Sequence, residues 1–154
     1  MVDTFLAQTT HLVFASIWAG SVFYVAVVVL PLARDGAFNT TKPLEAISGK
    51  LTMISRVSAL VLLLTGGHLA GTRYTAESLF NSINGQLVLV MVALWLLLAA
   101  LVEIGAKRLE AGLNGKKLRE PAADVLGLYR VAAVVAIALL VVAGAITTNV
   151  QAVV

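Results

Sequence analysis

The chain contains no cysteine among its 154 residues, and only 12% of its residues are charged. The absence of cysteine excludes disulfides, thiolate metal sites and cysteine nucleophiles. The chain also lacks a Gly-x-Ser-x-Gly motif, a His-Glu-x-x-His motif and a Walker lysine, so nothing in it indicates a hydrolase. The shortage of charge, 60% hydrophobic residues and a mean hydropathy of +0.96 are atypical of a soluble domain. These features predict an integral membrane protein.

Four uncharged runs divide the chain, over residues 4–33, 57–72, 78–102 and 131–154. A membrane span needs about 20 apolar residues. The second run is shorter, so we expect its helix to begin earlier, near Pro43, because proline suits a first helical turn. The pattern predicts an all-α fold, one domain with a four-transmembrane-helix bundle. The expected helices cover about 4–33, 43–73, 84–111 and 121–149.

The basic residues are distributed unevenly between the three loops. Four Lys or Arg flank the first loop and six flank the third, whereas Arg73 alone marks the second. The positive-inside rule therefore predicts a multi-pass protein of the cell membrane with both termini extracellular or periplasmic. The net charge of +3 follows from this asymmetry and does not indicate a nucleic-acid partner. The opening residues, MVDTF, lack a basic region and so argue against a cleaved signal peptide.

Two histidines, His11 and His68, are the only ones in the chain, and both lie in apolar segments. His11 lies 23 residues before Arg34 and His68 lies 18 residues after Lys50, which are about 34 Å and about 27 Å along a helix. Both imidazoles are thus expected in the outer half of the membrane. Consecutive helices joined by a short loop are usually neighbours, so the two histidines are predicted to share a site.

The surroundings of the two histidines allow two interpretations. Trp18 lies seven residues after His11 and therefore on the same helical face. Gly67 and Gly71 flank His68 and leave a strip without side-chain bulk. Such a strip permits close helix packing, with His68 hydrogen-bonded in the core, or it leaves room for a flat cofactor.

The stretch HLVFASIWAGSVFYVAVVVLPLA resembles the opening helix of the CopD-like membrane proteins, in which a His precedes a Trp-x-Gly element, an aromatic residue and a Pro. The matching residues are His11, Trp18, Gly20, Phe23 and Pro31. The stretch is also similar to the HemJ-type protoporphyrinogen oxidases, small bundles that bind haem b through helix histidines. The resemblance implies haem b as cofactor. Ala19, found where a second glycine is common, and the absence of a Met cluster depart from the copper-handling pattern.

Haem fits the inventory of ligands better than copper does. Two imidazoles can bind one iron from opposite faces of a porphyrin, whereas copper with two His ligands would need a third donor. Met91 is the intramembrane residue at a suitable depth for that role, although Met usually fills a core. Arg73 could pair with a haem propionate or anchor the helix at the surface. Trp18 could line the porphyrin face.

A second polar set is expected at the cytoplasmic interface, where Arg56, Glu103 and Arg130 end three of the uncharged runs. An acid between two basic side chains can hold the helices in register or relay protons. We favour the structural role, because Glu103 can also pair with Lys107 at ordinary helical spacing.

The sequence therefore predicts a protein that binds haem b and acts in electron transfer or porphyrin redox chemistry, with a bis-histidine site near the outer surface. The expected site residues are His11, His68, Trp18, Gly67, Gly71 and Arg73. A quinone or a porphyrin is the expected partner within the lipid bilayer. The alternatives are transport of copper or another small solute, and a non-catalytic accessory subunit of a homo-oligomer or larger membrane complex. Whether the chain is an enzyme stays open.

Overall fold

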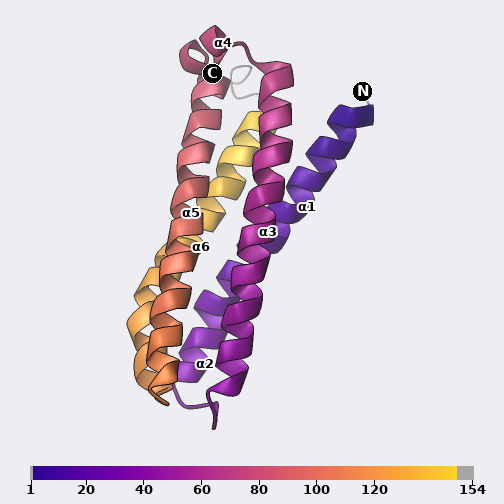
Figure 1. Cartoon of the computed structure of the whole chain (residues 1–154). Helices are drawn as coiled ribbons and strands as arrows, with labels where there is room; N and C mark the ends of the chain where they lie inside the picture. The colour runs from indigo at the N-terminus through magenta and orange to yellow at the C-terminus, as the bar shows by residue number, and fades with distance from the viewer. Residues whose placement is uncertain (1, 149–154) are drawn as a thin grey trace.

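The computed structural model describes residues 2–148, and every regular element in them is a helix (Figure 1). The elements in chain order are α1 (Val2–Tyr24), a π-helical segment η1 (Val25–Val29), α2 (Leu30–Arg34), α3 (Lys42–Arg73), α4 (Ala76–Asn81), α5 (Ile83–Asn114) and α6 (Arg119–Thr147). Four helical spans, 2–34, 42–73, 83–114 and 119–147, are long and apolar enough to cross a membrane. The prediction of an all-α bundle of four transmembrane helices is confirmed.

The helix ends follow from local sequence. Pro43 lies in the first turn of α3, and Gly115 ends α5 at its C-cap. Thr75 forms a capping box with Ser78 and starts the short helix α4, which was not among the expected elements. Ser82 then accepts a hydrogen bond from the Gly85 amide and starts α5. The fourth helix begins at Arg119, two residues before the expected start, and residue 149 of its expected end lies outside the described residues.

The first span is continuous from α1 through η1 to α2, but its hydrogen-bond pattern changes at Val25–Val29. The Leu30 amide donates to the Val25 carbonyl five residues back, as in a π-helix. Pro31 follows directly and has no amide hydrogen to donate to the carbonyl four residues before it. A proline is thus accommodated within a membrane span that continues to Arg34.

The bundle has two different ends. One, the loop end, contains residues 35–41 and 115–118; the other, the terminal end, contains Val2, α4 and Thr148 (Figure 1). Neighbouring pairs of the long helices are α1 with α3, α1 with α6, α3 with α5, and α5 with α6. At the terminal end, the first turns of α1 diverge from the other helices (Figure 1).

The buried core lies in the half of the bundle next to the loop end. Its residues come from 18–33 of the first span, 44–62 of α3, 98–113 of α5 and 121–136 of α6. In the other half, Gly85 is the single buried residue among those that the structure describes. Large apolar side chains such as Leu64, Val90 and Val141 are exposed there, as expected where helices face lipid and not water.

Candidate functional site

His11 is held by a hydrogen bond to the neighbouring helix. Its Nδ1 atom lies 2.8 Å from the Thr65 hydroxyl oxygen, and the imidazole is partly buried between α1 and α3. The Thr65 hydroxyl donates its own hydrogen to the Val61 carbonyl, 2.7 Å away, one turn earlier in α3. The position of His11 is therefore set by a side chain that is itself fixed to the helix backbone.

This chain of hydrogen bonds favours one tautomer of the ring. With the Thr65 hydroxyl donating to the Val61 carbonyl, its oxygen accepts from His11 when Nδ1 carries the hydrogen. In the neutral ring the other nitrogen, Nε2, then keeps its lone pair. Nε2 makes no hydrogen bond within residues 2–148. Metal-ligating histidines usually donate their other ring N–H to a fixed acceptor, so this arrangement leaves Nε2 available as a ligand atom.

The glycines beside the site have different surroundings. A Cβ atom on Gly66 would lie 3.1 Å from His11 Cε1, so this glycine accepts the edge of the imidazole. A Cβ atom on Gly67 or Gly71 would meet nothing within 4 Å. The two glycines predicted to leave room for a cofactor thus border open space, whereas the glycine that contacts His11 was not among the predicted site residues.

His68 lies close to His11 in height but on another face of α3. His11 contacts Thr65 and Gly66, two or three residues before His68, which is about 3–5 Å along the helix. The side chain of His68 is exposed, and it is rotated about 60° around the axis from Thr65. The structure therefore shows His11 packed between helices and His68 outside that contact; that they share one iron stays a prediction.

Arg73 makes a second polar contact between the same two helices. Its Nη2 atom donates to Gln8 Oε1 at 2.7 Å, at the terminal end of α1 and α3. The Gln8 and Arg73 pair lies one to two turns beyond the His11 and Thr65 pair, so two hydrogen bonds join α1 to α3 in the half of the bundle that lacks a buried core. Gln8 was not among the predicted site residues.

Two tryptophans carry buried indole N–H groups that make no hydrogen bond within the described residues. They are Trp18, which is 1% exposed in the core, and Trp95. Arg56 faces Glu103 across the antiparallel helices α3 and α5, so the residue of α5 level with Thr65 is Leu94 or Trp95. Trp95 therefore lies at the same depth as His11. Most buried indole N–H groups have a hydrogen-bond partner, so these two are exceptions within the described residues.

The available donors indicate which metals the chain can hold. Residues 2–148 contain no group of three or more His, Asp or Glu side chains that could hold a metal ion. A bare copper ion bound by imidazoles would lack its further donors there. The porphyrin of haem supplies four nitrogen ligands to the iron, so the protein needs to supply only one or two more. The free Nε2 of His11, the exposed imidazole of His68 and the open glycines Gly67 and Gly71 fit that demand.

Two members of the second polar set, Arg56 and Glu103, form an ion pair in the half of the bundle next to the loop end. Arg56 donates to both carboxylate oxygens of Glu103, with Nε 2.7 Å from Oε1 and Nη2 3.0 Å from Oε2. This bidentate geometry joins α3 to α5 and agrees with the structural role predicted for Glu103. Arg130 is exposed and makes no ion pair in the part of the chain that the structure describes.

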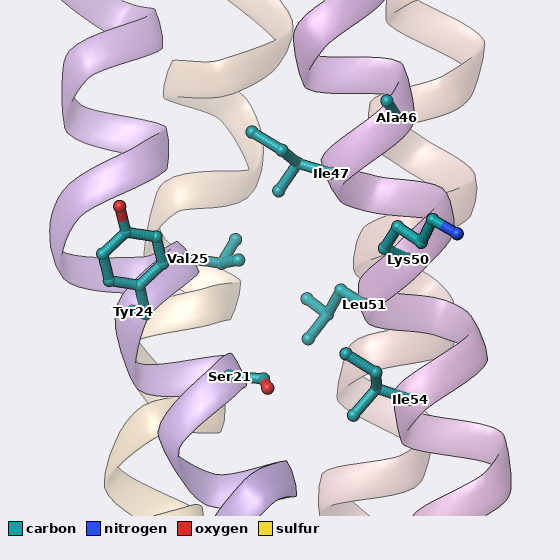
Figure 2. Close-up of a pocket in the computed structure, with 8 residues that line it drawn as sticks. All are labelled: Ser21, Tyr24, Val25, Ala46, Ile47, Lys50, Leu51 and Ile54. Atoms are coloured by element: carbon teal, nitrogen blue, oxygen red, sulfur yellow. The ribbon is translucent and has the colours of Figure 1, made fainter.

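An apolar groove of about 280 Å³ lies between the first span and α3 near the loop end. Figure 2 shows Ile47, Leu51 and Ile54 of α3 directed toward Tyr24 and Val25, whereas the Lys50 ammonium points away. None of the predicted site residues lines this groove. It is separate from the His11 site.

The fold and the site together define a class, a small four-helix membrane protein with a hydrogen-bonded histidine in the half of its bundle next to the terminal end. Comparison with models of known families, with curated proteins and with solved structures found no match to this chain.

Proposed function

We propose that this chain binds haem b in the membrane and acts in electron transfer or porphyrin redox chemistry. His11 and His68 are the residues that would hold the haem iron. The observation that carries the proposal is the bond from His11 Nδ1–H to Thr65, which leaves Nε2 as a free donor to a metal. When bound, haem would supply one-electron redox chemistry.

The chain's own residues have separate roles in this proposal. Thr65 fixes the tautomer and orientation of His11, while Gly67 and Gly71 leave space along α3 for a planar group. Trp18, two turns from His11 on the same span, and Trp95, at the depth of His11 on α5, each offer an unpaired indole N–H within the described residues. Arg73, already held by Gln8, places positive charge where a propionate would reach the membrane surface.

The same proposal includes orientation. We place both termini, and with them the His11 site, on the extracellular or periplasmic side of the cell membrane. The support is the excess of Lys and Arg around the first and third loops, which form the loop end of the bundle. A quinone or a porphyrin dissolved in the bilayer could then reach the site between the diverging helices.

The test is an absorption spectrum of detergent-purified protein, first oxidised and then reduced with dithionite. We expect a Soret band and sharp reduced bands. His11→Ala and His68→Ala should each convert a low-spin spectrum to a mixed or high-spin one, and the double variant should lose haem. Thr9→Ala is the matched control, because Thr9 is exposed two residues before His11 on the same helix.

Other outcomes would support other functions. Stoichiometric copper without haem would favour transport. The absence of both haem and copper would favour an accessory subunit. A full low-spin spectrum in His68→Ala would show that His68 is not a ligand and leave His11 as the single protein ligand. Trp18→Phe keeps an aromatic ring and removes the N–H, so it should change the spectrum slightly.

A further inference from the structure

A charged groove lies between α3 and α5 in the half of the bundle next to the loop end. Its volume is about 720 Å³, and it is lined by three carboxylates, two basic side chains and several hydroxyl or amide groups. The charged residues are Glu45 and Arg56 from α3, and Glu103, Lys107 and Glu110 from α5. No residue of the His11 site lines it.

The charges in the groove are only partly paired. Arg56 and Glu103 form the bidentate ion pair, which accounts for one charge of each sign. Lys107, Glu45 and Glu110 make no hydrogen bond or ion pair within the described residues. The groove therefore presents one cation and two carboxylates to a ligand.

The position of the groove relates it to the membrane boundary. Arg56 and Glu103 are the charged residues that border the uncharged runs of α3 and α5, and on the polar side of that boundary the groove extends from Arg56 to Glu45. This is eleven residues, or about 17 Å. On the apolar side, α3 exposes Val57, Leu60 and Leu64 directly above the groove. A ligand seated here would have a polar head and an apolar tail.

We infer that this groove binds a zwitterionic phospholipid whose headgroup carries a primary ammonium, as in phosphatidylethanolamine. The ammonium would donate to Glu45 and Glu110, the phosphodiester would accept from Lys107, and the acyl chains would lie along the exposed apolar face of α3. A lipid with an anionic headgroup and no ammonium would leave both carboxylates unpaired and close to its own charge. The proposal is independent of haem binding.

Native mass spectrometry of the purified chain with added lipid tests this site. We expect phosphatidylethanolamine to bind more tightly than phosphatidylglycerol of the same acyl chains. Glu110→Gln and Lys107→Gln should each weaken phosphatidylethanolamine binding by roughly two- to fivefold, as for an exposed charge contact. The matched controls are Asp124→Asn and Arg108→Gln, exposed charges of the same sign that do not line the groove, and they should bind as the wild type does.

Two further measurements test the headgroup preference itself and the need for acyl chains. Removing both free carboxylates, as Glu45→Gln with Glu110→Gln, should narrow the preference for phosphatidylethanolamine over phosphatidylglycerol, which mere loss of stability would not do. Glycerophosphoethanolamine, which has the headgroup without acyl chains, should compete poorly. The proposal is overturned if phosphatidylglycerol binds equally well, if the control variants lose binding as much as the groove variants, or if the soluble headgroup competes as well as the lipid.

Discussion

Thr65→Val is the substitution that most directly tests how His11 is held. Valine has nearly the shape of threonine but no hydroxyl, so it removes both the acceptor for His11 Nδ1–H and the bond to the Val61 carbonyl. Leaving a buried polar group without its partner costs about 1–3 kcal/mol. Hydrogen bonds between membrane helices measure about 0.6 kcal/mol on average. We expect a loss of about 0.6–2 kcal/mol, because the imidazole is only partly buried.

Two measurements separate the stability effect from the effect on the ring. Denaturation by sodium dodecyl sulfate reports the free energy of unfolding. Nitrogen-15 NMR of histidine-labelled protein at a pH where the ring is neutral reports the tautomer, which should be Nδ1–H for His11 in the wild type. Thr65→Val should raise the Nε2–H population, since the bond that selects Nδ1–H is gone. Haem affinity, if haem binds, should fall about 10–100-fold, as for other outer-shell partners of metal ligands.

The controls for Thr65→Val use conservative changes in the same helix. Thr65→Ser keeps the hydroxyl and should keep the tautomer. Thr72→Val removes an exposed hydroxyl that bonds only to the Leu69 carbonyl, so it should leave His11 unchanged. An Nε2–H tautomer in the wild type, or an unchanged tautomer in Thr65→Val, would refute the hydrogen-bond assignment.

Glu103→Gln should lower the thermal midpoint in detergent and leave any haem spectrum intact, because the ion pair joins helices far from His11; unchanged stability with lost turnover would point to a proton relay instead. Gly105→Ala should destabilise the bundle by about 1–3 kcal/mol, because its Cβ would lie 2.7 Å from the buried Tyr129 ring. Gly127→Ala should instead stabilise α6 by about 0.5–1 kcal/mol, because a Cβ at residue 127 would meet nothing within 4 Å. Both are read by detergent denaturation, and equal effects would contradict the packing argument. A reporter active only in the cytoplasm should be active when inserted at Gly115 and silent at the C-terminus; the reverse would invert the proposed orientation.

The sequence predicted the number of spans because charge and apolar length act locally along each helix. It did not predict α4, whose capping box joins Thr75 to Ser78 at the very start of the third uncharged run. Side-chain partners across helices depend on rotation about each axis, which hydropathy does not encode. The partners Thr65 and Gly66 of His11 could therefore not be derived, even though His11 itself stood out.

The difference in depth between His11 and His68 also could not be predicted accurately from the sequence. Counting residues from Arg34 and Lys50 separates them by about 7 Å, whereas the contact of His11 with Gly66 reduces this to about 3–5 Å. Counting from flanking basic residues assumes that these residues lie at equal heights on both helices, which a sequence does not establish. The groove between α3 and α5 was likewise beyond sequence reasoning, since its walls come from residues about fifty positions apart.

The π-turn at Val25–Val29 works as a one-residue insertion in the first span, and it sets the angular phase between the two halves of that helix. Deleting one valine there and closing the turn as an α-helix would rotate the preceding residues by about 100° relative to those that follow. His11 would then point away from Thr65, although it lies fourteen residues from the deletion's edge. A single gap within VAVVV in a related sequence would therefore signal the loss of this site even where the histidine itself is kept.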